Sequence, residues 1–454
     1  MKIINSPFHF KGGIHPQYHK DLGDREAIRE LPLPAKLTVP MSMHLGAPAK
    51  PVVKVGDIVK AGQLIAEAGG FISAPVHAPA AGRVKSIDQT VTAPGRSCQA
   101  IVIETSPEQE WELMPPIPDW GSADPKTLLE RIGAAGVVGM GGAGFPTKVK
   151  LSPPPNKPID TIILNGAECE PYLTGDNRMM VEHADHIAVG AQIMRRILGA
   201  EKLRVAIEDN KPDAIEAMAK AFEGVDGDVA VVRLHTVYPQ GSEKHQIYAV
   251  TGREVPRGGL PMDAGCVVEN VSTVYAIYDA VVNGRPLTRR VIEVTGEGVA
   301  HPANLMAPFG VSYAEMIEAC GGYVGKPAKL ISGGPMMGFA QANGDIPCGK
   351  TTGGILVLPP REVSNFTSQA CISCGRCVDA CPMRLIPSEL SQLIEAEDID
   401  GAANISLMDC VECGCCAWVC PAHRPLVQHF RRGKAIVNAK RAAERAKQQE
   451  AAKK

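Results

Sequence analysis

The sequence predicts a multidomain α/β protein that ends in a cysteine-rich module. Its 454 residues are enough for about three domains. In the middle of the chain, apolar strands alternate with helical stretches, as a parallel α/β sheet requires. Near the end, nine of the 14 cysteines fall between Cys371 and Cys420. Because such clustering is typical of metal ligation, this module is expected to hold metal.

Composition excludes several classes of function. The formal net charge is −2, so no strong field favours nucleic acid, and none is expected as a partner. No apolar run approaches the ~20 residues of a membrane-spanning helix. The start, MKIINSPFHFKGG, lacks the apolar core of a signal peptide. The sequence therefore predicts a soluble protein made in the cytoplasm that is still able to dock on a membrane complex.

Two segments within residues 40–90, VKVGDIVKAGQLIAEAGG and SAPVHAPAAGRVKSI, resemble the halves of a lipoyl or biotinyl β-sandwich. Residues 1–115 are therefore expected to contain an N-terminal β-sandwich hybrid. A swinging-arm carrier needs a lysine at the hairpin tip, where this chain has AGGF at 68–71. A docking or packing role is favoured over a carrier role, and His77 is interpreted as a turn residue.

A glycine-rich stretch at 136–151, GVVGMGGAGFPTKVKL, carries Gly139, Gly141 and Gly144 in the spacing of a dinucleotide-binding loop. That fingerprint needs a strand before it and a helix after it. Here Asp124 and Pro125 open a helix in front, and SPPP from 152 ends any helix behind. The stretch is therefore not a Rossmann loop. So bare a backbone can instead approach a phosphate or a flat ring.

The region 120–285 is expected to form the parallel α/β domain. The strand in DTIILN leads into a loop rich in Asn, Glu and Asp, and LRVAIED and DVAVVRL repeat the pattern, with helices expected at 181–199 and 212–222. Ligands bind open α/β sheets at the carboxyl ends of their strands. The polar loops are therefore candidates for a binding site.

A second stretch, GDIPCGKT at 344–351, satisfies the phosphate-loop pattern of nucleotide hydrolases. That motif must lead into a helix, whereas TTGGILVLPP predicts a strand. We therefore do not expect ATP to bind there. Residues 286–345 pair the strand TRRVIEVTG with a helix opened by a Ser312–Glu315 capping box, and resemble a β-grasp domain. This domain either spaces two redox centres or serves as a rigid connector.

The cysteine region at 360–430 contains C-x2-C-x2-C-x3-C-P twice, which is the spacing of bacterial two-cluster ferredoxins. In that pattern three thiolates bind one cluster and the fourth binds the other. One [4Fe-4S] cluster is thus assigned Cys371, Cys374, Cys377 and Cys420, and the other Cys410, Cys413, Cys416 and Cys381. Zinc is less favoured because zinc sites usually use paired ligands. Cys415 and the five cysteines outside this region are interpreted as bystanders.

Residues 431–454 form an Ala-rich, basic segment. A solvated helix is the favoured interpretation, and attraction to anionic membrane or partner surfaces is the alternative.

Four separated motifs carry a family resemblance: GMGGAGFPTKVKL, LNGAECEP, YPQGSEKHQ and VVENVST. They resemble the flavin- and NADH-binding segments of the flavoprotein subunit of respiratory complex I. From GGIHP at 12–16 to the cysteine motifs, nearly the whole chain is similar to the RnfC family, the C subunits of the Rnf ion-translocating ferredoxin:NAD oxidoreductase complexes. Two positions depart from the complex I pattern, Ala167 and Glu269, which stand where the relative carries Asp and Asn.

The resemblance implies FMN in the glycine loop with NAD(H) stacked above it. By position, the residues around FMN would be Gly139, Gly141, Gly142, Lys150, Asn165, Glu168, Glu243 and Asn270. Phe145, Glu168 and Tyr238 would lie near the nicotinamide nucleotide. Lys150 would offer a cation to the flavin phosphate.

The resemblance also implies a function. Hydride would pass between NAD(H) and FMN, and single electrons would pass through the two clusters, because flavin converts two-electron into one-electron chemistry. No protein acid or base is needed, so no catalytic residue is assigned. Partners would be the other subunits of a membrane Rnf-type complex and, indirectly, ferredoxin, with this chain peripheral on the cytoplasmic face of the bacterial inner membrane. Two rival functions are a flavin-free iron-sulfur relay or scaffold, and the electron-entry subunit of a soluble hydrogenase or formate dehydrogenase.

Overall fold

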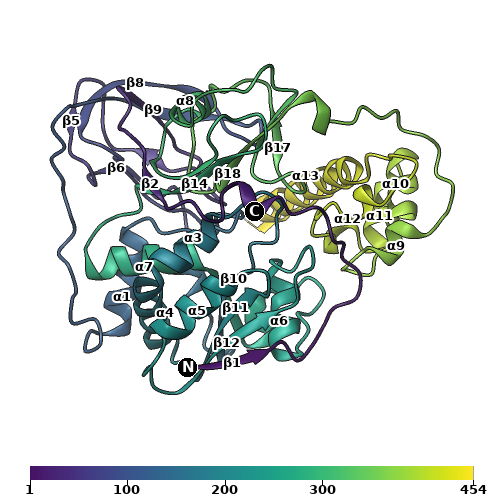
Figure 1. Cartoon of the computed structure of the whole chain (residues 1–454), viewed down its shortest axis with the longest axis horizontal. Helices are drawn as coiled ribbons and strands as arrows, with labels where there is room; N and C mark the ends of the chain where they lie inside the picture. Colours follow the sequence, from purple (N-terminus) through teal and green to yellow (C-terminus); the bar gives the residue numbers. More distant parts are fainter. Residues whose placement is uncertain (453–454) are drawn as a thin grey trace.

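The computed structural model describes residues 1–452 and arranges them as four sheets with their helices and a helical C-terminal module (Figure 1). The glycine-rich stretch and the cysteine motifs belong to different units of this arrangement. The way these units contact one another positions the candidate site.

A five-stranded sheet forms the centre of the α/β domain, in the order β1-β12-β11-β10-β13 with all neighbours parallel. Its central strands are almost entirely buried, because helices cover both faces of a parallel sheet. The predicted parallel α/β domain is thus confirmed. The strands are β1 (Lys2–Asn5), β10 (Thr161–Gly166), β11 (Lys202–Glu208), β12 (Asp228–Leu234) and β13 (Cys266–Asn270).

Helices cover this sheet where the sequence predicted crossovers. Asp124 caps the helix in front of the glycine loop, accepting from the backbone N–H of Thr127 at 3.3 Å. The helix expected at 181–199 covers the end of α3 and all of α4. The helices of the domain are α1 (Pro125–Ala134), α2 (Thr147–Lys150), α3 (Gly175–Glu182), α4 (Ala184–Leu198), α5 (Pro212–Ala221), α6 (Glu243–Thr251) and α7 (Val271–Val282).

The N-terminal sandwich consists of two small sheets, β3-β9-β8-β5 and β4-β6-β7. His77 lies within strand β7 and is 5% exposed, so its interpretation as a turn residue is wrong. In the sequence, the strand is flanked by Ala74 and Ala78. Both residues are small and buried, so they leave room for the strand to pack closely. The strands are β3 (Lys36–Pro40), β4 (Lys50–Pro51), β5 (Ile58–Val59), β6 (Leu64–Glu67), β7 (Val76–His77), β8 (Gly82–Val91) and β9 (Ser97–Thr105).

A mixed sheet follows, in the order β17-β16-β18-β14-β15-β2. Its helix α8 (Tyr313–Ala319) begins at the predicted capping box, in which Ser312 and Glu315 bond each other's backbone N–H. The TTGGILVLPP stretch forms strand β18, as predicted. The strands are β2 (Arg29–Glu30), β14 (Arg289–Thr295), β15 (Ala303–Pro308), β16 (Lys329–Ser332), β17 (Phe339–Gln341) and β18 (Gly354–Leu358).

Three expected domain boundaries need correction. Strand β1 pairs with β12 and β2 pairs with β15, so these two strands belong to later sheets rather than to the N-terminal sandwich. Strand β18 extends the mixed sheet past residue 345. Helix α13 (Leu426–Ala452) runs through the expected boundary at 430. Local sequence does not indicate which distant strand a segment pairs with, so such pairing could not be predicted from it.

Short helices form the C-terminal module around the cysteines, and its apolar core includes Leu390, Leu407 and Phe430. Across residues 1–452, no helix is both long and apolar enough to span a membrane. The helices are α9 (Arg376–Asp379), α10 (Pro387–Glu395), α11 (Ile399–Asn404), α12 (Cys415–Trp418) and α13.

We expect Gly190→Ala to destabilise the protein. Helix propensity alone would favour alanine in α4 by about 1 kcal/mol. However, a Cβ at residue 190 would stand 2.2 Å from the carbonyl oxygen of Val274 in the packed helix α7. Overpacking of this kind costs about 1–3 kcal/mol. Thermal denaturation followed by circular dichroism tests the sign, with Gly121→Ala as control, since a Cβ there meets nothing within 4 Å. An unchanged or raised melting temperature for Gly190→Ala would contradict the packing.

Candidate functional site

The candidate site, here called the strand-end site, lies at the carboxyl ends of β10 and β13. Asn165 and Asn270 are register partners there on adjacent strands. Asn270 caps α7, accepting from the backbone N–H of Ser272 at 3.0 Å, and donates to Asp176 at 2.6 Å. Asn165 donates to the carbonyl of Gly241 at 2.9 Å. Both asparagines therefore bind neighbouring loops and fix the edge on which a ligand would rest.

The glycine loop crosses this edge and is held at both ends by a bridge between Val138 and Pro146. A Cβ at Gly141 would stand 3.3 Å from the Cβ of Asn270, so this glycine permits close approach to β13. Gly142 has a φ of 120°, and a Cβ there would meet nothing within 4 Å. The exposed backbone at 141–143 thus borders free space.

Lys150 lies between two carboxylates, with its Nζ 2.8 Å from Glu243 and 3.7 Å from Glu269. Burial by itself would lower the pKa of Lys150, but the two carboxylates raise the pKa overall. Burial raises the pKa of Glu269, while Lys150 opposes this shift. Because its charge is already balanced, Lys150 does not fit the expected role of a free cation for a phosphate. Its donors suit a neutral polar edge of a ligand.

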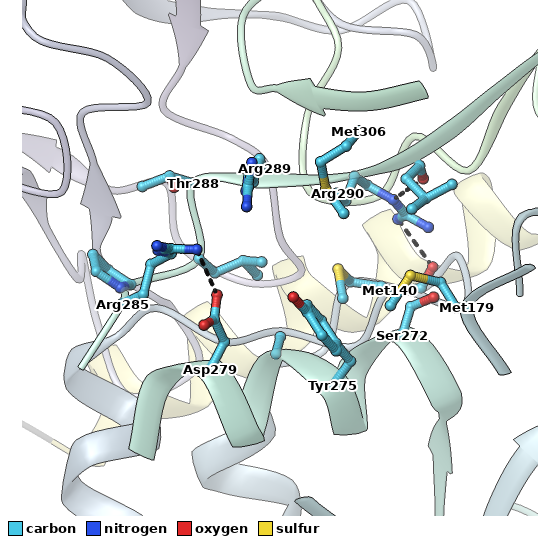
Figure 2. A pocket seen from close by; sticks show the side chains of 14 residues that line it. Met140, Met179, Ser272, Tyr275, Asp279, Arg285, Thr288, Arg289, Arg290 and Met306 are labelled. Carbon is cyan, nitrogen blue, oxygen red and sulfur yellow. Dashed lines mark hydrogen bonds and ion pairs between the residues drawn. The ribbon is translucent and has the colours of Figure 1, made fainter. Parts of the chain in front are cut away.

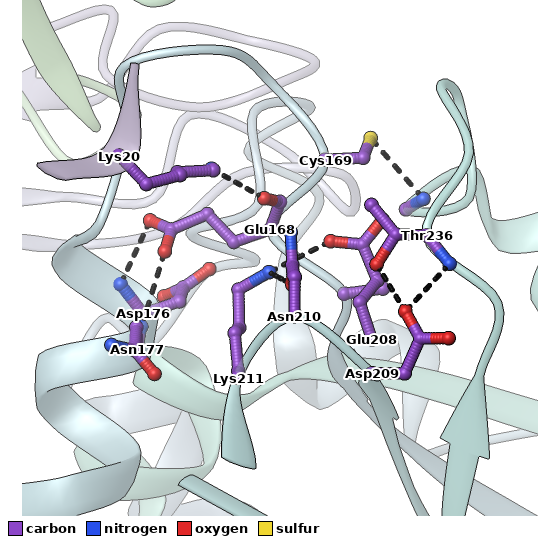
Figure 3. Close-up of polar contacts among 12 residues, drawn as sticks. Lys20, Glu168, Cys169, Asp176, Asn177, Glu208, Asp209, Asn210, Lys211 and Thr236 are labelled. Carbon is purple, nitrogen blue, oxygen red and sulfur yellow. Dashed lines mark hydrogen bonds and ion pairs between the residues drawn. The ribbon is translucent and has the colours of Figure 1, made fainter. Parts of the chain in front are cut away.

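Glu168 caps α3, and its two oxygens accept from the backbone N–H of Asp176 at 2.9 Å and Asn177 at 3.1 Å (Figure 3). Burial, then the nearby Asp176 carboxylate, raise the pKa of Glu168. Behind it, Lys20 donates to the carbonyls of Glu168 at 2.7 Å and Glu170 at 2.8 Å. A lysine from the N-terminal segment thus fixes the loop that follows β10.

The two aromatic residues expected near a nicotinamide lie in different places. Phe145 is half-buried in the glycine loop, and its carbonyl accepts from the N–H of Gly139 at 2.9 Å. Tyr238 is fully buried, and its hydroxyl donates to the carbonyl of Cys413 at 2.7 Å. The expectation that Tyr238 contacts a nucleotide is therefore wrong, because its ring faces the cysteine module.

A small cavity lies on the other side of the glycine loop, between α7 and β14 (Figure 2). Its lining includes Met140 from the loop and Ser272 and Tyr275 from α7. No residue predicted to bind flavin or nucleotide lines this cavity. It is thus distinct from the strand-end site.

The two cysteine runs repeat the same left-handed backbone turn, 39 positions apart. Ser373 and Glu412 both have left-handed φ values, 56° and 58°, although neither is glycine. The N–H of Ser373 donates to the sulfur of Cys371 at 3.4 Å, and the N–H of Glu412 donates to that of Cys410 at 3.3 Å. A left-handed non-glycine residue is strained, and such strain is typical of functional sites.

One cavity is lined by four cysteines that come from both runs. We call these the inner set: Cys381, Cys410, Cys413 and Cys416. Its other walls are mostly apolar, including Leu390 and Phe430. The remaining ligand candidates, here called the outer set, lie nearer the surface, with Cys374 exposed: Cys371, Cys374, Cys377 and Cys420.

Within residues 1–452, no three His, Cys, Asp or Glu side chains converge as they would around one metal ion. The four cysteines of the inner set surround a cavity, which fits a four-iron cluster, in which each thiolate binds a different iron. The apolar enclosure of the inner set fits the same group.

The inner set faces the α/β domain. Besides the contact between Tyr238 and Cys413, the ring of His245 lies 3.2 Å from the carbonyl of Pro382. A third contact runs through Glu170, which accepts from the N–H groups of Met336 and Met337 at 3.1 and 2.8 Å. Met336 in turn lies against Gly414 of the cysteine module. A Cβ at Gly414 would stand 3.1 Å from the carbonyl oxygen of Met336.

The strand-end site also fits a flavin. The buried side-chain oxygen of Gln246 has no hydrogen-bond donor among residues 1–452. Gln246 donates to Asn165 at 2.6 Å, so it belongs to the edge beneath the glycine loop. A buried acceptor of this kind needs a donor, which flavin and ribityl groups supply.

Sequence reasoning missed Lys20 and the role of Glu170 as a link between domains. Asp176 belongs to the polar segment that the sequence predicts as a candidate site, and it lies in the first turn of α3. Lys20 gave no signal, since a lone lysine near the start of a chain is usually a solvated surface group.

Comparison with known families matches four segments of the chain. Residues 132–279 match the model of the Nuo51 FMN-binding domain, and residues 8–108 match the RnfC barrel sandwich hybrid domain. Residues 291–340 match the SLBB domain, and residues 370–423 match the 4Fe-4S dicluster domain.

Three curated relatives match across nearly the whole chain. The C subunit of the proton-translocating ferredoxin:NAD(+) oxidoreductase complex of Clostridium ljungdahlii is 49% identical, with 96% of each chain covered. The C subunit of the Na(+)-translocating complex of Acetobacterium woodii is 44% identical, covering 95% of this chain and 98% of that one. The C subunit of an ion-translocating oxidoreductase complex of Rhodobacter capsulatus is 45% identical, covering 95% and 83%.

A solved structure of an NAD+-reducing [NiFe]-hydrogenase in the H2-reduced state also matches, with a TM-score of 0.49 and 21% identity. The match covers 70% of this chain and 64% of that one.

Glu170 gives the site a pH-dependent stability. Burial raises its pKa from 4.5 to about 7, against the opposing effect of the Met336 and Met337 N–H groups. Between these values the folded chain binds more protons than the unfolded chain, so the stability contributed by this residue falls as pH rises. Relative to Glu170→Gln, the free energy of unfolding of the wild type should fall by up to about 3 kcal/mol between pH 4.5 and 7, because one pKa unit corresponds to about 1.4 kcal/mol.

Urea denaturation midpoints measured for both proteins at several pH values from about 4 to 8 test this expectation. The difference in stability between the two proteins should change steadily across the interval between the two pKa values and level off above pH 7. Parallel pH profiles would contradict a raised pKa for Glu170.

Proposed function

Because the chain belongs to the RnfC family, the C subunits of ion-translocating ferredoxin:NAD(+) oxidoreductase complexes, we propose that its strand-end site exchanges hydride between NAD(H) and FMN. The family relatives cover the chain almost end to end, and the FMN-binding and 4Fe-4S matches fall on the two segments where the sequence predicted these cofactors. The chain is thus an oxidoreductase subunit that uses FMN and iron-sulfur clusters.

When bound, FMN would take up hydride from NADH and release single electrons. The chain's own residues would bind and orient it. The bare backbone at 141–143 would admit the ring, and Asn165 and Asn270 would hold the loops around it. Lys150 would donate to a polar edge, kept in place by Glu243 and the buried Glu269.

The nicotinamide nucleotide would lie over the exposed side of the glycine loop, near Phe145. Glu168 would act through α3, whose first turn it caps, and not by touching the nucleotide directly. Its two oxygens are already occupied by backbone N–H groups at 2.9 and 3.1 Å.

Two [4Fe-4S] clusters would occupy the inner and outer cysteine sets. The observation that carries this proposal is the cavity lined by Cys381, Cys410, Cys413 and Cys416, the four residues that the ferredoxin spacing assigns to one cluster. Tyr238 and His245 of the α/β domain contact the backbone around this cavity. The inner set is thus the one that would hold a cluster beside the α/β domain, and the outer set would hold one nearer the surface.

We further propose that the chain docks peripherally on the cytoplasmic face of the membrane, against the other subunits of its complex, and exchanges electrons with ferredoxin only through them. The relatives' names describe ion-translocating oxidoreductase complexes of several subunits, which supports membership of a complex. We also keep the β-grasp assignment for the mixed sheet, supported by the parallel pairing of β14 with β18 and by α8 between the two hairpins.

An anaerobic preparation should contain about eight iron atoms and one FMN per chain, as two [4Fe-4S] clusters and one flavin require. Addition of NADH should bleach both the flavin and the cluster absorption. Iron without flavin would contradict the hydride-transfer proposal and favour the relay or scaffold. Flavin bleaching with the clusters left oxidised would contradict the electron path.

Cys413→Ser should lower the iron content to about four atoms per chain, because Cys413 belongs to the inner set and a [4Fe-4S] cluster needs all four thiolates. Cys415→Ser is the matched control: Cys415 is two residues away and fully buried, but its sulfur faces the carbonyl of Tyr238 at 3.8 Å. Iron analysis and electron paramagnetic resonance of the reduced proteins distinguish the two variants. Equal iron loss in both would refute the ligand assignment.

A further inference from the structure

The lysine of the GDIPCGKT stretch, where we do not expect ATP to bind, contacts the glycine loop instead. Lys350 is fully buried, and its Nζ donates to the carbonyl of Gly136 at 2.7 Å and to that of Pro75 at 2.8 Å. Gly136 begins the glycine loop, and Pro75 belongs to the N-terminal sandwich. One ammonium group thus joins three units of the chain.

Arg290 supports the same loop at a second point. Its guanidinium donates to the carbonyl of Met140 at 3.1 Å and to that of Lys350 at 2.7 Å. Figure 2 shows this side chain directed at the loop from β14. Arg290 is 6% exposed. Lys350 and Arg290 are therefore linked to each other and to two carbonyls of the loop.

The end of the loop is enclosed by the same segment. A Cβ at Gly144 would stand 2.7 Å from the methyl group of Thr351, and the carbonyl of Gly144 accepts from the N–H of Leu45 at 2.9 Å. The start, middle and end of the glycine loop are thus all held by residues from outside the α/β domain.

These two cations direct their donors at carbonyls. Among residues 1–452, no ion pair joins Lys350 or Arg290 to a carboxylate at salt-bridge distance. A buried amine without a carboxylate partner is costly, and burial lowers the pKa of Lys350 to about 7. The loop carbonyls compensate part of that cost, which ties the position of the loop to the lysine.

We propose that Lys350, together with Arg290, is a positioning residue that holds the glycine loop in its ligand-binding shape. A glycine-rich backbone samples many conformations, so its affinity for a ligand falls by the fraction of time it spends in other shapes. The lysine would remove that loss by tethering the loop to two neighbouring domains. This inference rests on the proposed function of the loop as a flavin site.

The test compares Lys350→Met, which keeps most of the length of the side chain and removes its donors, with Cys348→Ala. Cys348 is fully buried in the same stretch, but its sulfur bonds the carbonyl of Pro308 at 3.3 Å instead of the glycine loop. Hydrogen exchange of the flavin-free full chain reports the loop at 136–145, with strand β10 as internal reference.

Lys350→Met should raise the exchange rate at 136–145 by about tenfold or more, in line with the loss of buried hydrogen bonds, and leave β10 unchanged. The dissociation constant for added FMN should rise about tenfold to a hundredfold. The kcat for NADH oxidation at saturating FMN should stay close to that of the wild type. Cys348→Ala should match the wild type in all three measurements.

Exchange rates at 136–145 equal to those of Cys348→Ala would overturn the proposal. If Lys350→Met does not fold, Arg290→Lys carries the same test. It keeps the positive charge and removes the guanidinium nitrogen that donates to the carbonyls of both Met140 and Lys350. A wild-type chain that binds no FMN would refute the proposed function, whereas the exchange measurement would still decide whether Lys350 orders the loop.

Discussion

Buried amines that donate to backbone carbonyls determine the shape of both loops at the strand-end site. Lys20 binds the carbonyls of Glu168 and Glu170 in the loop after β10, and Lys350 binds that of Gly136 at the start of the glycine loop. An irregular loop leaves carbonyls without strand or helix partners, and buried carbonyls must be satisfied. Here the donors come from segments far away in sequence. The site therefore takes shape only when the N-terminal sandwich, the mixed sheet and the α/β domain are docked together.

Carboxylates outnumber the cation at the strand-end edge. Lys150 lies between Glu243 and Glu269, and Asp176 accepts from the neutral amide of Asn270 at 2.6 Å. A flavin would meet a hydrogen-bonding edge beneath bare backbone, with one ammonium group held between carboxylates. The departure of Glu269 from the complex I pattern becomes understandable in this setting, because this carboxylate compensates the buried side of Lys150.

The two cysteine sets differ in their surroundings. The inner cysteine set is enclosed by apolar side chains and touches the α/β domain through Tyr238, whereas the outer set includes the exposed Cys374. Enclosure and hydrogen bonding tune cluster potentials. Clusters in the two sets would therefore differ in potential, although the two cysteine runs have the same spacing.

The sequence by itself determined whatever depends on local spacing: the two cysteine runs, the alternation of strand and helix, the Asp124 cap, and the reasons why neither GVVGMGGAGF nor GDIPCGKT is a nucleotide loop of the usual kind. Only the tertiary structure decided that β1 and β2 join later sheets, that Tyr238 faces the cysteine module, and that Lys20 and Lys350 bind loop carbonyls. The reason is physical. Local patterns follow from the geometry of neighbouring residues, while the partner of a buried lysine or an edge strand depends on which distant segments pack against it, and one sequence without its fold does not specify that.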